Sequence, residues 1–174
     1  LAQENRMTAA ALLLAFVTLE RLAELWLARR NTKALLSKGA VEVAPGHYPL
    51  IVMLHSFWLA GLWVLGWQKS VGAVWLAIFF LLQALRVWVL ATLGSRWTTR
   101  IIVQPDLPLV ATGPYLLLSH PNYVVVVGEI AVLPLCLGLP WYALAFSLAN
   151  AAVLTIRIRA ENAALAGMRD FGIR

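Results

Sequence analysis

The sequence predicts an all-α integral membrane bundle of about five transmembrane helices, and three observations carry this prediction. Of the 174 residues, 61% are hydrophobic and only 13% are charged, whereas a soluble domain is roughly 45–50% apolar and about 25% charged. The apolar residues gather in long runs, and residues 48–67 contain no Asp, Glu, Lys or Arg. The eight Trp residues suit the two interfaces of a bilayer better than the core of a small soluble domain.

The length fits a single transmembrane domain over residues 1–174. A helix needs about 20 mostly apolar residues to cross the hydrocarbon core. The predicted spans are residues 7–28, 48–67, 71–94, 123–139 and 141–156, and residues 95–122 form a polar loop.

The first span reaches the required length only if it includes Glu20, Arg21 and Glu24. Glu20 and Glu24 are four residues apart and therefore share one face of the helix, turned toward the bundle or the lipid headgroups. Because these charges lie near the predicted membrane edge, we interpret them as an interfacial cluster with no chemical role.

Two further polar residues lie inside predicted spans. Arg86 in the third span costs about 2.5–3.5 kcal/mol unless it finds a partner, and Glu129 in the fourth span is the candidate. His55 lies in the second span. A lone His on an apolar helix is usually hydrogen-bonded to a neighbouring helix, and contact with a substrate is the alternative.

The basic residues predict the orientation of the chain in the membrane. Lys and Arg flank the apolar segments, which indicates topology and not nucleic-acid binding. Only Arg6 and Lys69 lie on the side opposite the basic connections. We therefore expect the N-terminus outside and the C-terminus in the cytoplasm. The basic side carries Arg29, Arg30, Lys33, Lys38, Arg96, Arg100, Arg157, Arg159, Arg169 and Arg174.

Residues 113–123 concentrate polar and aromatic side chains between two apolar segments. Pro121 suits the first turn of a helix, and His120 and Tyr123, three residues apart, can line one side of a pocket. Arg157 and Glu161 are four apart on one helix face, where they could bind a zwitterion or form an ordinary ion pair. The three His and the single Cys lack the spacing of a metal site, so we expect no metal.

Several motifs, taken together, resemble one family. Ser-Arg-Trp-Thr-Thr-Arg from Ser95, Gly-Pro-Tyr at 113–115, His-Pro-Asn-Tyr at 120–123 and Arg-x-x-x-Glu at 157–161 are similar to motifs of the isoprenylcysteine carboxyl methyltransferase family. The resemblance covers nearly the whole chain and looks closest to the short bacterial members.

This resemblance implies a multi-pass protein of the bacterial inner membrane that transfers a methyl group from S-adenosylmethionine to a lipophilic acceptor. It implies a cofactor pocket in the C-terminal half, at the cytoplasmic face. Glu161 would bind the cofactor's ammonium group, Arg157 would be catalytic and face the acceptor, and His55 would contact the acceptor. The other expected cofactor contacts are Leu107, Pro108, Leu109, Val110, Tyr115, His120, Pro121, Asn122 and Tyr123.

Two positions depart from the family pattern: Ser119 stands where an Arg is usual, and Asn162 where a second Glu often follows. The expected partners are the lipid bilayer and a lipophilic small molecule or prenylated cysteine, with no nucleic acid. The acceptor group is either the carboxylate of an S-isoprenylcysteine or the hydroxyl of an alkylated phenol or pyrone. A non-catalytic protein that binds lipid or quinone is the alternative of a different class.

Overall fold

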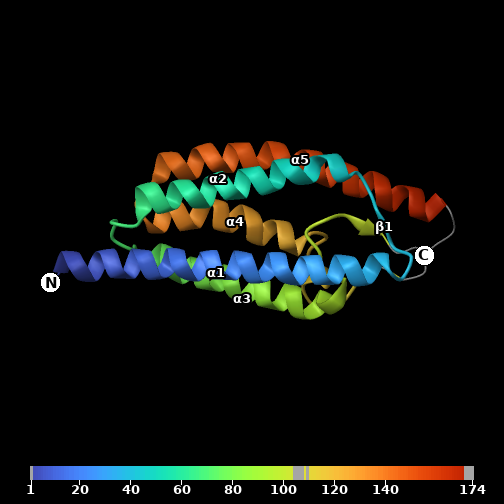
Figure 1. The fold of residues 1–174 in the computed structure, drawn as a ribbon, viewed down its shortest axis with the longest axis horizontal. Coiled ribbons are helices and arrows are strands. Elements are labelled where there is room, and N and C mark those ends of the chain that lie inside the picture. Colours follow the sequence, from blue (N-terminus) through green and yellow to red (C-terminus); the bar gives the residue numbers. More distant parts are fainter. Residues whose placement is uncertain (1, 104–107, 109, 171–174) are drawn as a thin grey trace.

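The computed structural model describes residues 2–103, 108 and 110–170, and most of this part of the chain is helical. The five α-helices of the described residues lie side by side along one long axis (Figure 1). They are α1 (Ala2–Leu36), α2 (Tyr48–Gly66), α3 (Ala73–Leu93), α4 (Pro121–Cys136) and α5 (Pro140–Asp170). The predicted all-α membrane bundle is confirmed.

Among the described residues, three helical segments are long and apolar enough to cross a membrane: Pro45–Gly66, Ala73–Arg96 and Pro140–Ala163. The other two predicted spans do not reach this standard by length and composition. α4 has 16 residues, fewer than the roughly 20 that cross the hydrocarbon core. α1 has 35 residues but carries charges in its apolar part. α5 continues well beyond residue 156, where the fifth span was predicted to end.

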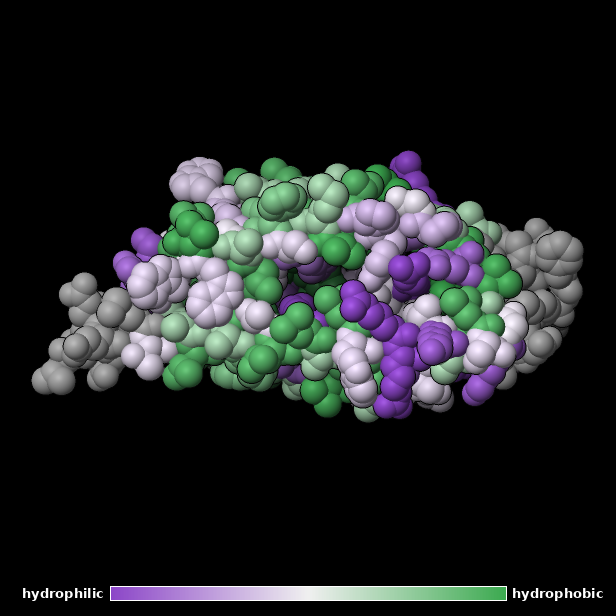
Figure 2. Space-filling view, in the orientation of Figure 1, coloured by the Kyte–Doolittle hydropathy of each residue, from purple (hydrophilic) through white to green (hydrophobic). Residues whose placement is uncertain are grey.

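α1 has opposite chemistry on its two sides. Glu24 is turned inward and is 8% exposed, while large apolar side chains point out of the bundle. A protein in water does the reverse, so this pattern fits a helix in contact with lipid. Figure 2 shows hydrophobic residues over much of the middle of the bundle, and hydrophilic ones gathered toward the end where α1 connects to α2. The outward residues of α1 are Leu12, Phe16, Leu19, Leu22 and Trp26.

Glycines allow close packing where helices meet. α3 packs on α4, and α4 on α5. A Cβ atom on Gly128 of α4 would lie 2.7 Å from Leu82 of α3, and one on Gly61 of α2 would lie 2.1 Å from the Tyr142 hydroxyl of α5. Small residues let helices approach closely in a membrane, where packing drives their association.

The predicted partner of Arg86 is confirmed. Arg86 donates from Nε to Glu129 Oε1 at 2.8 Å and from Nη2 to Glu129 Oε2. Its Nη1 donates to Glu24 Oε1 at 2.7 Å. Arg21 bonds Glu24 at 2.6 Å and also Glu129, and Gln83 donates to Glu129 at 2.9 Å. We call these five residues the ion cluster.

The interpretation of the α1 charges as an interfacial group is therefore wrong for Arg21 and Glu24. Both lie in the ion cluster, because the inward face of α1 meets Arg86 of α3 and Glu129 of α4. Glu20 lies at the edge of this cluster, 3.8 Å from Arg86 Nε. Charges within a bundle gain enough from mutual pairing to be kept at membrane depth.

Short elements fix the loops at one end of the bundle. β1 (Val41–Glu42) pairs antiparallel with β2 (Ile102–Val103), and Asn31 of α1 donates to the carbonyls of Gly94 and Trp97 at 3.2 and 2.9 Å. These contacts hold the loop after α3 against α1. Three 3₁₀ helices complete the described elements: η1 (Pro45–His47), η2 (Gly94–Arg96) and η3 (Gly113–Leu116).

Candidate functional site

A cavity of about 280 Å³ lies at this end of the bundle, and we call it the polar cavity. The loop after α3, β2, η3, the start of α4 and the continuation of α5 contribute its walls. Both charged and aromatic side chains reach it, which is the mixture that small-molecule sites use for orientation and binding. The polar and aromatic lining residues are Arg96, Trp97, Thr98, Arg100, Tyr115, Ser119, His120, Asn122, Tyr123, Arg157 and Glu161.

A second cavity of about 270 Å³, the apolar cavity, lies between α1, α2, α4 and α5. Ile51, Leu59, Val126 and Leu154 are among its apolar lining residues. Figure 2 shows a hollow between α1 and α2 near the middle of the bundle, with hydrophilic atoms visible inside it. Arg21, Glu24 and Arg86 of the ion cluster line the same cavity.

The two cavities share one wall. Trp97, Thr98, Asn122, Tyr123 and Arg157 line both of them. A group held in the polar cavity and another in the apolar cavity would therefore meet the same side chains. Group transfer between two bound molecules needs this kind of adjacency.

Two side chains of the wall, Tyr123 and Arg157, form a hydrogen-bonded chain with Glu161, which lines the polar cavity only. Arg157 Nε donates to the Tyr123 hydroxyl at 2.9 Å, and that hydroxyl donates to Glu161 Oε2. Arg157 Nη1 also donates to the Thr99 carbonyl at 2.8 Å, and its guanidinium carbon lies 5.6 Å from the centre of the Tyr123 ring. Arg157 and Glu161 thus meet on Tyr123, instead of forming the direct ion pair that their spacing also allowed. We call Tyr123, Arg157 and Glu161 the wall group.

The start of α4 explains how the aromatic part of the site is built. Pro121 opens the helix and is fully buried, and His120 precedes it. Because His120 and Tyr123 are three residues apart, their rings stack at 5.1 Å between centres, 25° from parallel. Tyr115 of η3 faces the same cavity. Burial, and then the charge of Glu161, raise the pKa of Tyr115 to about 12, so its hydroxyl stays a neutral donor near pH 7.

Most of the predicted cofactor contacts come together in the polar cavity: Val110, Tyr115, His120, Asn122, Tyr123 and Glu161. Pro121 supports the helix start without lining either cavity. Pro108 is exposed, and its carbonyl accepts a bond from Arg96. Leu107 and Leu109 lie outside the described residues.

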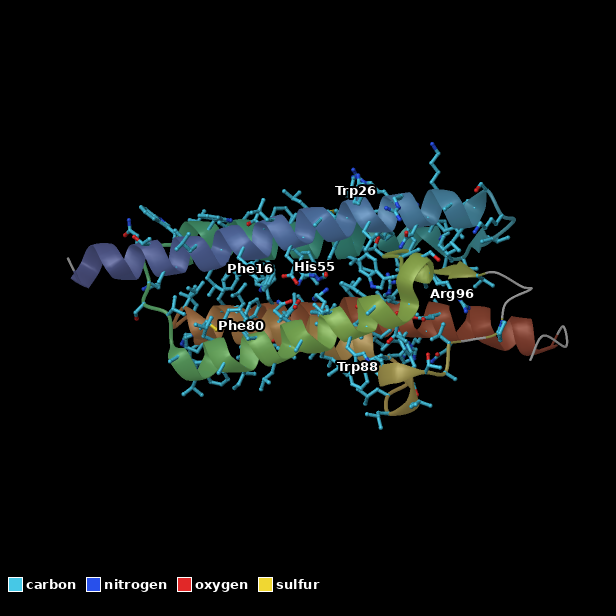
Figure 3. The ribbon with its side chains drawn as sticks, turned by 90° about the horizontal axis from the view of Figure 1, so that it is seen from below. Phe16, Trp26, His55, Phe80, Trp88 and Arg96 are labelled. Carbon is cyan, nitrogen blue, oxygen red and sulfur yellow. The ribbon has the colours of Figure 1, made fainter. Side chains whose placement is uncertain are left out.

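His55 lines the apolar cavity and not the polar one, and it shares the apolar cavity with Asn122 and Tyr123. Figure 3 shows it inside the bundle, between the α1–α2 side and the helices opposite. Its Nδ1 contacts the Ile51 carbonyl at 2.9 Å, and its ring lies edge-on to Trp58. The expected hydrogen bond to a neighbouring helix is therefore wrong, since Ile51 belongs to the same helix. Because a carbonyl only accepts hydrogen bonds, Nδ1 carries the hydrogen. In the neutral ring, Nε2 is then the nitrogen without a hydrogen, which can act as an acceptor.

Sequence reasoning did not assign Arg96, Trp97, Thr98 and Arg100 to the site, although all four line the polar cavity. They belong to the Ser-Arg-Trp-Thr-Thr-Arg motif, which supports the family resemblance but by itself implies no residue role. The signal that could have found them is this cluster of polar and aromatic residues directly after a membrane span.

The fold and the two cavities define an integral membrane protein with a polar pocket beside an apolar one. The sequence profile of the isoprenylcysteine carboxyl methyltransferase (ICMT) family matches residues 75–167. This chain belongs to that family, and membership implies a membrane methyltransferase.

Two relatives extend the similarity beyond the matched segment. The chain is 39% identical over 159 residues to the uncharacterized protein YpbQ of Bacillus subtilis, covering 88% of this chain and 95% of the relative. It is 27% identical over 150 residues to an uncharacterized protein of Haemophilus influenzae, covering 78% of this chain and 83% of the relative. No solved structure matches the chain.

Proposed function

We propose that the protein is an S-adenosylmethionine-dependent O-methyltransferase that acts on a lipophilic acceptor at the membrane. The observation that carries this proposal is the wall shared by the polar and the apolar cavity. It supports a water-soluble methyl donor on one side and a lipid on the other. The polar cavity faces the cytoplasm in this proposal, as the distribution of Lys and Arg predicts.

The residues of the polar cavity fit S-adenosylmethionine by their chemistry. Glu161 supplies a carboxylate for the ammonium group, and only one of its oxygens is bonded to Tyr123. Tyr115, His120 and Tyr123 offer aromatic surface, and Val110 and Asn122 add an apolar and a hydrogen-bonding contact. A site with both kinds of surface suits a ligand that combines a nucleoside with an amino acid.

S-adenosylmethionine supplies an electrophilic methyl group on a sulfonium. The protein's task is then to align the acceptor and to exclude water. Arg157 orients the acceptor oxygen, because it lines the apolar cavity and is fixed by Tyr123 and Thr99. A carboxylate acceptor is already ionised at neutral pH and needs only this orientation, which favours the terminal carboxylate of an S-isoprenylcysteine.

One observation favours a second acceptor class, the hydroxyl of an alkylated phenol or pyrone. A phenol with a pKa near 10 needs a base to remove its proton. His55 lines the apolar cavity, and its Nε2 is the ring nitrogen without a hydrogen, which can accept that proton. His55→Phe separates the two classes. It should lower the rate on a phenol at least about 100-fold and leave the rate on a carboxylate nearly unchanged.

The test of the proposal combines binding with product analysis. The purified protein in lipid nanodiscs is titrated with S-adenosylmethionine in a calorimeter, and is then incubated with radiolabelled S-adenosylmethionine and lipids extracted from the host. We expect binding and a labelled lipid. Absence of binding would favour a non-catalytic protein that binds lipid or quinone.

A further inference from the structure

Arg96, Arg100 and Arg157 line the polar cavity, and two of them are already committed to other partners. Arg157 is held by Tyr123 and by a backbone carbonyl. Arg100 Nη1 donates to both carboxylate oxygens of Glu42, at 2.8 and 2.9 Å. Its guanidinium carbon also lies 4.5 Å from the centre of a Tyr ring. Glu42 already neutralises Arg100, and Arg157 faces the acceptor in the proposed function.

Arg96 differs from both. Its Nη2 donates to the Pro108 carbonyl at 2.7 Å, and within the described part of the chain it has no carboxylate partner. That single bond uses one of the five N–H donors of a guanidinium. Arg96 is partly exposed at the end of η2, so its remaining donors can reach a ligand in the cavity.

The charges of the polar cavity are complementary to an amino-acid group. Among the described residues that line the polar cavity, Glu161 is the one with an acidic side chain. A zwitterion also needs a cation for its carboxylate, and a guanidinium binds a carboxylate through two parallel hydrogen bonds. Ser119, the residue before His120, lines the same cavity but carries no charge.

We propose that Arg96 binds the carboxylate of the methionine moiety of S-adenosylmethionine, in the polar cavity that Glu161 also lines. This inference rests on the proposed function. It assigns the Arg of the Ser95-Arg-Trp motif to the cofactor and gives Arg157 no part in holding the carboxylate. The cation of the carboxylate site then comes from the loop after α3 and not from position 119.

Two ligands test the contact directly by calorimetry on the full chain in nanodiscs. S-adenosylmethionine has the carboxylate, whereas decarboxylated S-adenosylmethionine keeps the sulfonium and the ammonium but lacks it. We expect the unmodified protein to prefer S-adenosylmethionine about 10- to 100-fold, the range for one charge-assisted contact. Arg96→Gln should abolish this preference, and Arg96→Lys should keep part of it.

Arg159→Gln is the matched control, because Arg159 is exposed on α5 and lines neither cavity. It should keep the full preference. Adding Ser119→Arg to Arg96→Gln should restore part of the preference, since the new side chain enters the same cavity.

Three results would overturn the inference. Arg96→Gln could keep the preference with unchanged affinities. It could also lower the affinity for both ligands equally, which would mean that Arg96 acts only by holding the loop. If Arg96→Gln does not fold, an undiminished preference in Arg96→Lys contradicts the bidentate contact. No binding of either ligand to the unmodified protein would instead refute the proposed function, and the inference with it.

Discussion

Two groups of charged side chains lie in the same bundle, and they differ in how fully their hydrogen-bonding atoms are used. In the ion cluster, Arg86 donates from all three of its nitrogens, and both oxygens of Glu129 accept. In the wall group, Glu161 has one oxygen bonded to Tyr123 and lines a cavity.

The difference shows what an Arg–Glu combination does inside a membrane protein. Arg86 and Glu129 are each 3% exposed and satisfy one another, so they hold α1, α3 and α4 together. Arg157 is also buried, but its group lines both cavities, whereas the ion cluster reaches only the apolar cavity. We therefore expect substitutions in the ion cluster to affect stability, and substitutions in the wall group to affect binding and turnover.

The largest effect is expected from Glu129→Gln. Removing one partner of a buried ionic group leaves the others unpaired and typically costs about 3–5 kcal/mol. The thermal unfolding midpoint in detergent should fall strongly, whereas Arg159→Gln on the exposed face of α5 should change stability by less than about 0.5 kcal/mol. Combining Arg86→Glu with Glu129→Arg should recover little of the loss, because the new carboxylate would face Glu24 and the new guanidinium would face Arg21. Equal stability of Glu129→Gln and the unmodified protein would contradict the structural role.

The next largest effects are expected from substituting the two charged members of the wall group. Arg157→Ala should reduce turnover at least about 100-fold, as loss of a fixed donor at a reacting oxygen does, with a smaller loss of cofactor affinity. Glu161→Ala should weaken cofactor binding about 10- to 100-fold. Calorimetry with S-adenosylhomocysteine and a radiolabel assay separate the two effects. Equal loss of cofactor affinity in both variants would refute this division of roles.

A smaller effect is expected from Tyr123→Phe. This change keeps the ring stacked on His120 but removes the hydroxyl that joins Arg157 to Glu161. Turnover should fall about 10-fold, consistent with one or two lost hydrogen bonds of about 1 kcal/mol each, while the unfolding midpoint changes little. If the midpoint falls as far as in Glu129→Gln, the wall group is structural, and the contrast between the groups disappears.

The smallest effect is expected at the pair of Arg100 and Glu42, whose side chains are 39% and 20% exposed. Water screens such a pair, and exposed ion pairs contribute about 0–1 kcal/mol. Glu42→Gln should therefore lower stability by less than about 1 kcal/mol in a denaturation experiment. A loss as large as that in Glu129→Gln would show that the β1–β2 pairing depends on this contact.

The sequence predicted the five-helix bundle well, because long apolar runs have few alternatives to a membrane helix. It also paired Arg86 with Glu129, since an unpaired charge at that depth is too costly. It did not place Arg21 and Glu24 in the same cluster. Their partners lie 108 and 62 residues away along the chain, and only helix packing brings them together.

The candidate site was predicted in part for a similar reason. Helical spacing places His120 beside Tyr123 and Arg157 beside Glu161. The sequence therefore predicted that each pair shares one face. The Tyr123 hydroxyl as the meeting point of α4 and α5 did not follow, because it depends on how the two helices pack. The strand pair β1–β2 was missed as well, since two-residue strands show no periodicity.

The most direct test of the central claim is a calorimetric titration of the protein in nanodiscs with S-adenosylhomocysteine, carried out on the unmodified chain and on Glu161→Ala. Glu161 lines the polar cavity, which no member of the ion cluster does. The unmodified protein should therefore bind one ligand per chain, and Glu161→Ala should bind it at least about 10-fold more weakly. Absence of binding, or equal affinity in both proteins, would contradict the assignment of this cavity to the methyl donor.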